Sequence, residues 1–447
     1  MKKLIAMLLA LAMIFCLVAC SSSSDTAADA SQTQTTQETK TEDSSTSNET
    51  ESSSSDAVDT VKIGVFAAVS GVNSESGRQA TLAAETAEWY INEVLGGISS
   101  LGGAKVETVM IDSTSDPSTA SLPLEQALSN GGIVGIAGSA QSAIALTMLP
   151  ILQKYQVPAV TASATNVTIT EQGCEFIFQP APKSNTFGDT KYEFLKYYAD
   201  LKGIELSDLK FGIIYENSAW GSDTANSNRA LVENYGLNLV YDENYEAGAL
   251  TDATALVTKM KNAGVDILFP GCYANDAKLI MTACAAMDYM PIIFADGSAF
   301  TWPSLLNDLG DMVNGIISAD GFVNDMVGAR EFDEWQIINE HYEEVNGEFV
   351  PGQGGPTIMS YMMIYQALEQ AGVADSVAVR DQLRTFNKDN CKWLSVFYGD
   401  VGYDETGADM GARPIMLQWQ NRKPTCVYPE DAAASTVIDP LTLEPLK

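Results

Sequence analysis

The chain has 447 residues, which is too long for one small core and indicates two or three folded units, since domains usually span about 100 to 200 residues. It contains 58 acidic and 25 basic side chains and has a formal net charge of -33 at pH 7. Such acidity disfavours nucleic acid and anionic membrane surfaces as binding partners.

The first twenty residues, MKKLIAMLLALAMIFCLVAC, have the features of an export signal. Lys2 and Lys3 precede an apolar run that ends at Ala19 and is short for a membrane span. The last four residues of this stretch, LVAC, resemble the bacterial lipobox. We therefore predict a lipoprotein signal peptide over 1–19 and an extracytoplasmic protein anchored by a lipid on Cys20. The alternative is a retained N-terminal membrane helix, which the short apolar run disfavours.

Residues 20–60 have the composition of a solvated spacer. From residue 21 on they contain no aromatic side chain, no Leu or Ile, and Lys40 as their single base. Such a segment cannot bury enough apolar area to fold, and we predict a disordered linker rich in Ser, Thr, Asp and Glu. As a flexible coil it would reach on the order of 35 Å, enough to hold a domain clear of a membrane.

From Val61 onward, short β-branched runs alternate with longer helical segments, a pattern typical of parallel α/β sheets. In the first unit this alternation predicts a doubly wound sheet with helices on both faces. The expected strands are 61–66, 106–112, 132–138 and 157–163, and the expected helices are 77–94, 118–129 and 141–154.

A second α/β unit of similar size follows 176–182, where two prolines interrupt the periodicity. The tail beyond it has too few strands for a third domain, so we expect it to complete both units. In the second unit we expect strands at 209–216, 237–245, 265–271 and 290–297 and helices at 185–202, 220–235, 251–263 and 274–288. In the tail we expect helices near 331–346, 355–372 and 376–387 and extended segments at 315–322, 395–407 and 413–423.

The usual catalytic and metal-binding residues are scarce. The one histidine, His341, lies among acidic residues and is expected on the surface, so histidine-dependent catalysis and histidine-ligated metals lack their central residue. The sequence has no phosphate-binding GxxxxGK[ST] loop and no GxGxxG fingerprint. Beyond Cys16 and Cys20 five cysteines remain, an odd number without a CxxC pair. We expect no metal, no cofactor and no enzymatic activity, although a hydrolase based on two carboxylates remains open.

Polar residues follow the expected strands, where ligands of open parallel sheets bind. In the first unit these are 138–142 and 163–165, and in the second they are 272–273 and Asp296. Hydroxyls near a helix start suit an α-carboxylate, whereas Asp296 suits an α-ammonium. The structural alternatives are helix capping by the hydroxyl residues and an Asx turn at Asp296.

Five segments, in order, resemble the branched-chain amino-acid-binding proteins, which are type I periplasmic substrate-binding proteins of ABC transporters. The resemblance extends from about Val61 to Lys423. Its segments are IGVFAAVSGVNSESGRQATLAAETAEWYINEVLGGI (63–98), VGIAGSAQSAIALTMLPILQKYQVPAVTASATN (134–166), IIYENSAWGSDTA (213–225), FPGCYANDAKLIMTACAAMDYMPIIFADG (269–297) and YDETG (403–407).

The resemblance implies ligand contacts from both units. An α-carboxylate would be held by hydroxyls and backbone groups of the first unit, and Asp296 would bind the α-ammonium. Trp220 would cover the ligand side chain, Ser76 stands where relatives often have tyrosine, and the tyrosine position of the second unit falls on Cys272 or Tyr273. The residues implied for the carboxylate are Ser142 and Thr165, with the backbone of Gln141, Ser163 and Ala164.

The resemblance also implies a fold of two lobes joined by three hinge crossovers near 180–184, 319–323 and 398–403. It implies that the protein is a monomeric lipoprotein that binds an amino acid and delivers it to ABC permease subunits. The apolar residues expected in the pocket favour an aliphatic or branched-chain amino acid. A sensory lipoprotein that signals to a partner is the alternative. The implied lobes are 61–182 plus 322–398 and 183–321 plus 399–447.

Overall fold

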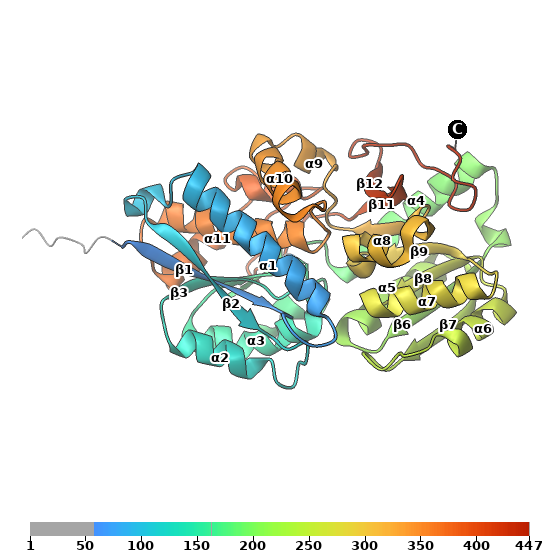
Figure 1. Cartoon of the computed structure of the whole chain (residues 1–447), viewed down its shortest axis with the longest axis horizontal. Coiled ribbons are helices and arrows are strands. Elements are labelled where there is room, and N and C mark those ends of the chain that lie inside the picture. Colours follow the sequence, from blue (N-terminus) through green and yellow to red (C-terminus); the bar gives the residue numbers. More distant parts are fainter. Residues whose placement is uncertain (1–57, 162, 447) are drawn as a thin grey trace, which may run out of the picture. The chain divides into compact units, whose positions relative to one another are not determined.

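The computed structural model describes residues 58–161 and 163–446 (Figure 1). The predicted signal peptide, Cys20 and the predicted linker, apart from its end at 58–60, lie outside the described residues. In the described part of the chain no helix is both long enough and apolar enough to cross a membrane.

The first sheet is parallel, as the sequence predicts, and has the strand order β2-β1-β3-β4-β5. Strand β4 is shorter than predicted: the chain leaves the sheet after Val160, and Ser163 and Thr165 line a cavity. The strands are β1 (Thr60–Ala67), β2 (Lys105–Asp112), β3 (Ile133–Gly138), β4 (Ala159–Val160) and β5 (Ile177–Phe178).

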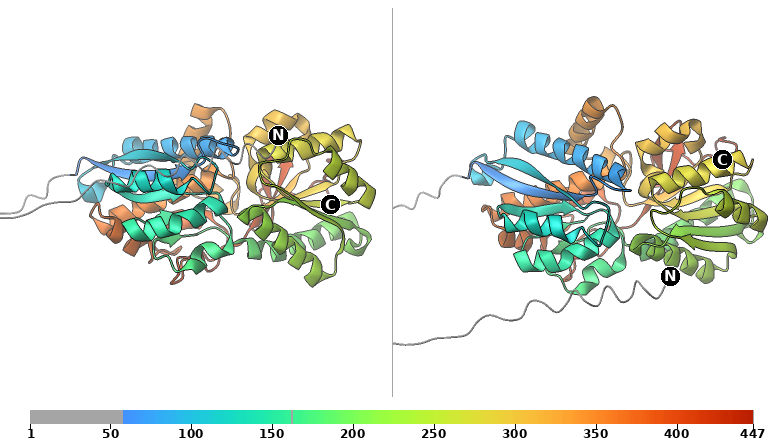
Figure 2. Two further views of the ribbon diagram at one scale, coloured as in Figure 1. Left: turned by 90° about the horizontal axis from the view of Figure 1, so that it is seen from below. Right: turned by 60° about the horizontal axis from the view of Figure 1, so that its bottom comes forward.

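Helices cover both faces of this sheet (Figures 1 and 2). Alternate residues of β1 point to opposite faces: Ile63 packs in the core shared with α1 and α11, while Phe66 packs in the core shared with α2 and α3. Gly135 of β3 lets α11 approach, since a Cβ there would lie 2.8 Å from Ile364. The helices of this lobe are α1 (Ser74–Trp89, continued by a π turn), α2 (Ser121–Ser129), α3 (Ser142–Tyr155), α9 (Val327–Arg330), α10 (Asp333–Asn346), α11 (Gly354–Ala371) and α12 (Ser376–Leu383).

The second sheet has the order β12-β11-β10-β9-β8-β6-β7 and is parallel from β7 through β10. Strands β11 and β12 are antiparallel additions, and β12 was not predicted. Asn421 and Arg422 join them with φ of 52° and 67°, the backbone of a tight hairpin turn. The strands are β6 (Lys210–Glu216), β7 (Asn238–Tyr245), β8 (Ile267–Gly271), β9 (Ile292–Asp296), β10 (Ile317–Asp320), β11 (Ile415–Gln420) and β12 (Lys423–Tyr428).

Helices again cover both faces of the second sheet. Alternation along β6 sends Ile213 into the core formed with α4 and α5, and Ile214 into the core formed with α6 and α7. The helices are α4 (Phe187–Lys202), α5 (Ala219–Tyr235), α6 (Thr254–Ala263), α7 (Ala274–Ala286) and α8 (Pro303–Leu309). The whole arrangement is the predicted pair of doubly wound α/β lobes.

Three segments connect the lobes, and they contact one another. The first and third are joined at Gln179, whose N–H donates to the Gly407 carbonyl (2.9 Å) and whose carbonyl accepts from the Asp409 N–H (3.0 Å). The second, which follows β10, passes so close to the first that a Cβ on Gly321 would lie 3.0 Å from Pro182. The connections therefore form one compact bundle next to the ends of β9 and β10.

Candidate functional site

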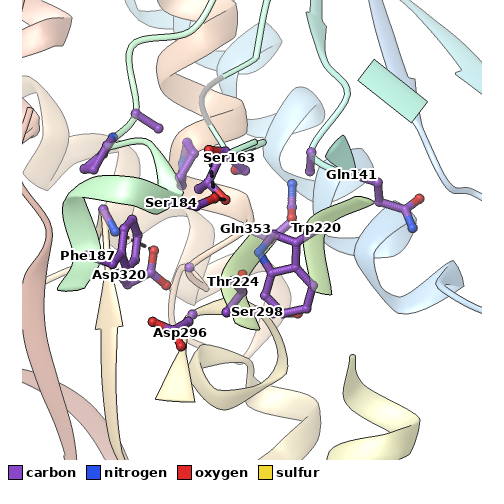
Figure 3. Close-up of a pocket in the computed structure, with 18 of the residues that line it drawn as sticks. Gln141, Ser163, Ser184, Phe187, Trp220, Thr224, Asp296, Ser298, Asp320 and Gln353 are labelled. Carbon is purple, nitrogen blue, oxygen red and sulfur yellow. Dashed lines mark hydrogen bonds between the residues drawn. The ribbon is translucent and has the colours of Figure 1, made fainter. Parts of the chain in front are cut away.

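A cavity of about 60 Å³ lies between the lobes, at the carboxyl ends of strands from both sheets (Figure 3). A single water needs roughly 10–15 Å³ on this measure, so the cavity suits a small ligand. Polar residues from the first lobe form one wall, and aromatic and acidic residues from the second lobe form the other. Among the described residues that line the cavity, none is Lys, Arg or His.

Most of the predicted ligand residues line this cavity. Those that do are Ser76, Gln141, Ser163, Thr165, Trp220, Tyr273 and Asp296. Ser142, Ala164 and Cys272 do not reach it: the Ser142 hydroxyl accepts from the Asn166 N–H (3.3 Å), the Ala164 carbonyl accepts from the Gln179 amide (2.6 Å), and Cys272 is fully buried. The structure thus places the side chain of Tyr273, and not that of Cys272, on the cavity wall.

Neutral hydrogen-bonding groups form the wall of the first lobe. Gln141 occupies the N-cap position of α3, and Ser142 is the first residue of this helix. Gln141 is 7% exposed, and its side-chain Oε1 has no hydrogen-bond partner in the described structure. Thr165 accepts a hydrogen bond from the Ser184 hydroxyl at the opposite lobe (3.1 Å). This wall therefore offers hydroxyl and amide groups beside a helix N-terminus, a combination suited to an anion.

Asp296 ends β9 and is held by an ion pair inside the protein. The Lys191 ammonium on α4 donates to both carboxylate oxygens (2.9 and 2.8 Å), and the Asn228 amide on α5 donates to Oδ2 (3.0 Å). The Lys191 side chain is 0% exposed and that of Asp296 is 6% exposed. Burial lowers the pKa of Lys191, while the Asp296 carboxylate opposes this shift. Asp296 therefore already has a counter-ion inside the second lobe.

A second carboxylate, Asp320, enters the cavity from the end of the adjacent strand. Strand β10 pairs with β9 so that Ala319 lies opposite Asp296, and Asp320 follows at the edge. The Gly321 N–H donates to its Oδ1 (2.6 Å). Burial, and to a smaller extent the charge of Asp296, raise the pKa of Asp320 to about 7. Within 58–161 and 163–446, Asp320 has no ion-pair partner, in contrast to Asp296.

Aromatic side chains cover the cavity from the second lobe. The Ser218 hydroxyl accepts from the Gly221 N–H (3.3 Å) and caps α5, which places Trp220 in its first turn. The Trp220 ring lies 5.0 Å from that of Tyr273, with 38° between the ring planes. Burial raises the pKa of Tyr273, so its hydroxyl stays neutral. Together with Phe187 and Trp302 these rings supply the apolar surface that a ligand side chain needs.

Several lining residues were not predicted. Asp320 could have been predicted from the sequence, because the triplet Ala-Asp-Gly occurs at the ends of both β9 and β10. The others lie within helices or turns and have no local signal; they include Ser184, Phe187, Thr224, Ser227, Ser298, Trp302, Gly352, Gln353 and Pro356.

The described residues contain no His, Cys, Asp or Glu group arranged to hold a metal ion. The five cysteines among them are buried and free. The lone histidine, His341, is half-buried and stacks on Trp89, with ring centroids 3.4 Å apart.

Two lobes with a cavity at the facing strand ends define a ligand-binding protein of the bilobal type. Residues 60–423 match the sequence profile of the periplasmic binding protein family, and this chain belongs to that family. The family is one of substrate-binding proteins that act outside the cytoplasm, and not one of enzymes.

Individual relatives agree with the resemblance seen in the sequence. The Leu/Ile/Val-binding protein homolog 7 of Brucella abortus is 26% identical over 383 residues, covering 84% of this chain and 93% of the relative. The branched-chain amino acid transporter substrate-binding protein LivJ of Streptococcus pneumoniae, solved with isoleucine, superimposes with a TM-score of 0.69 at 22% identity, over 83% of this chain and all of that one.

A third relative has a different kind of ligand. A solute-binding protein of an ABC transporter from Rhodopseudomonas palustris, solved with 3,4-dihydroxybenzoic acid, has a TM-score of 0.68 at 18% identity, over 86% of this chain and 99% of that one. These solved structures share the type I fold with this chain, and the fold alone does not select between their ligands.

The buried ion pair leads to a stability prediction. Lys191→Met should lower the free energy of unfolding by about 3–5 kcal/mol, because Asp296 would keep a buried charge without its counter-ion. The double variant Lys191→Met with Asp296→Asn should recover most of this loss, since both charges are then gone. Urea unfolding followed by tryptophan fluorescence measures both. Equal losses in the single and double variants would contradict the prediction.

Proposed function

We propose that this chain is an extracytoplasmic substrate-binding lipoprotein of an ABC importer that captures an amino acid between its lobes and delivers it to the permease. The observation that carries the proposal is the distribution of groups around one small cavity. Neutral donors lie on one wall, carboxylates lie on the other, and aromatic rings lie beside them. This pattern is complementary to an α-carboxylate, an α-ammonium and an apolar side chain. The names of the curated relatives support the same ligand class.

In the proposed complex the α-carboxylate lies against Gln141, Ser163 and Thr165, near the N-terminus of α3. Ser142 and Ala164 support this wall from behind, the first through Asn166 and the second through Gln179. Asp296 belongs to the wall that binds the α-ammonium.

Apolar contact with the ligand side chain comes from the second lobe. Trp220 and Tyr273 provide the rings, and Cys272 fills the core beneath them. Ser76 completes the opposite side of the specificity wall and leaves more room than a tyrosine would. An aliphatic, branched-chain side chain suits these surroundings.

Closure of the lobes is proposed to follow ligand binding. The three crossover segments contact one another and can act together as a hinge, because small backbone changes in such connections move whole lobes. A lipid on Cys20 and the spacer that follows would keep the lobes near the permease. Comparing uptake of the bound amino acid before and after gene deletion tests delivery against a purely sensory role.

Thermal unfolding of the purified protein tests the ligand class. At least one of the twenty common amino acids should raise the melting temperature, since a ligand at 100 times its Kd stabilises the native state by about 2.7 kcal/mol. 3,4-Dihydroxybenzoate serves as the comparison probe, because a protein of the same fold was solved with it. A shift with this acid and none with any amino acid would disprove the proposal.

Trp220 should contribute through ring contact alone. Trp220→Ala should weaken binding of the amino acid by about 30-fold, the equivalent of about 2 kcal/mol for the loss of a buried aromatic contact. Trp220→Phe, which keeps a ring next to Tyr273, should lose much less. Isothermal titration calorimetry measures both variants, and equal affinities in Trp220→Ala and the unaltered protein would remove Trp220 from the site.

A further inference from the structure

Three ionisable side chains lie at the acidic wall of the cavity: Asp296, Lys191 and Asp320. Two of them form an ion pair with each other, and the third does not. Asp296 and Lys191 face each other as an ion pair with two short contacts, so their charges largely cancel. Asp320 lies beside this pair and forms no ion pair within the described residues. When all three are ionised they carry a net charge of -1, and that charge is located on Asp320.

The Asp296 carboxylate is poorly placed to accept a second ammonium. Its Oδ1 accepts from Lys191, and its Oδ2 accepts from both Lys191 and Asn228. An ammonium that joined this carboxylate would also lie close to the Lys191 ammonium and be repelled by it. Lys191 cannot move into solvent, because its side chain is fully buried and its Nζ lies 4.4 Å from the centre of the Phe269 ring.

Asp320 lines the cavity, and residues without side chains pack close to its carboxylate. Two glycines, Gly297 and Gly352, flank its carboxylate, and a Cβ on either would lie 3.0 Å from Oδ2. Gly297 has a φ of 64°, a conformation that favours glycine, so the close approach of this turn to the Asp320 carboxylate is built into the chain after β9. The buried Ser298 hydroxyl, which also lines the cavity, has no hydrogen-bond partner in the described structure and could complete the coordination of a donor group.

We infer that Asp320, rather than Asp296, is the principal charged receptor for the ammonium of the ligand, and that Lys191 acts as an internal substitute for this ammonium at Asp296. The inference rests on the proposed function and sharpens it. The ligand is expected to carry a cationic amine, because the ionised Asp320 carboxylate lines the cavity without an ion-pair partner in the described structure. Acids without an amino group should therefore bind more weakly, although a protein of the same fold was solved with one.

Charge-removing variants of the two acids test the inference directly. Each amino acid that binds the purified protein is titrated, by calorimetry, into Asp320→Asn and into the double variant Lys191→Met with Asp296→Asn. Asp320→Asn should weaken binding by at least about 30-fold, because the ligand ammonium loses its charged partner. The double variant should lose clearly less, since it removes a pair that is already neutral. Asp208→Asn, an exposed acid elsewhere on the second lobe, is the matched control.

The outcomes separate the inference from the function on which it rests. If an amino acid still binds to Asp320→Asn but no longer binds to the double variant, the inference is overturned. The proposed function would still stand in that case. Deaminated acids provide a second arm: with L-leucine as the ligand, 4-methylpentanoate should bind at least about 30-fold more weakly. Equal affinity for both overturns the inference. If the protein binds no amino acid at all, the proposed function fails as well.

The dependence of affinity on pH provides a signature that a purely structural residue would not give. The charged groups that face Asp320 are Asp296 on β9 and, behind it, Lys191 on α4; Ser298 and Gln353 are neutral neighbours of the cavity. Because the pKa of Asp320 is raised to about 7, the carboxylate is ionised above this pH and protonated below it.

An amino acid keeps both of its own charges from pH 5 to pH 8, so protonation of Asp320 should control its affinity in this range. Affinity should be greatest near pH 8 and should fall by about tenfold per pH unit well below pH 7. Asp320→Asn should have a flat profile, whereas Asp208→Asn should retain the slope. A flat profile in the unaltered protein would contradict the role of Asp320.

Discussion

Parallel pairing of the strands is the constraint on which the site depends. Each parallel strand must be followed by a crossover, so the carboxyl ends of β1, β3 and β4 gather at one edge and those of β6, β8 and β9 gather at another. The polar residues that follow these strands cannot be satisfied within the sheets. When the two edges face each other, both sets of polar groups meet in the same cavity, and neither lobe alone contains a complete site.

Strand β10 joins the hinge to the site. It lies in the second sheet beside β9, and the chain that follows it crosses to the first lobe next to Pro182. Asp320 is the last residue of β10 and the first polar group of this crossover. A ligand bound to Asp320 would therefore contact one of the three connections between the lobes, so that binding and closure would be coupled through the backbone at the end of β10.

The sequence predicts the architecture better than the site. Alternating β-branched and helical segments were sufficient for both lobes, because parallel α/β units carry strong local patterns. Strand β12 was missed because its turn, Asn421-Arg422, lacks the glycine that usually marks a tight hairpin. Asp320 could have been found from the repeated Ala-Asp-Gly triplet. Lys191 could not, because 105 residues separate it from Asp296 and nothing around it distinguishes it from a surface lysine on a helix.

The Lys191 to Asp296 pair bears on how one fold can select different ligands. Related structures of this fold contain either isoleucine or a dihydroxybenzoic acid, so the lobes themselves do not determine the charge of the ligand. We infer that in this protein the charge of the ligand depends on which acid in the cavity lacks an internal partner. In this chain a buried lysine neutralises one acid and leaves the other free, and the wall opposite offers only neutral groups. A cavity of this kind favours a molecule whose positive end is fixed by an ion pair and whose negative end is held by hydrogen bonds alone.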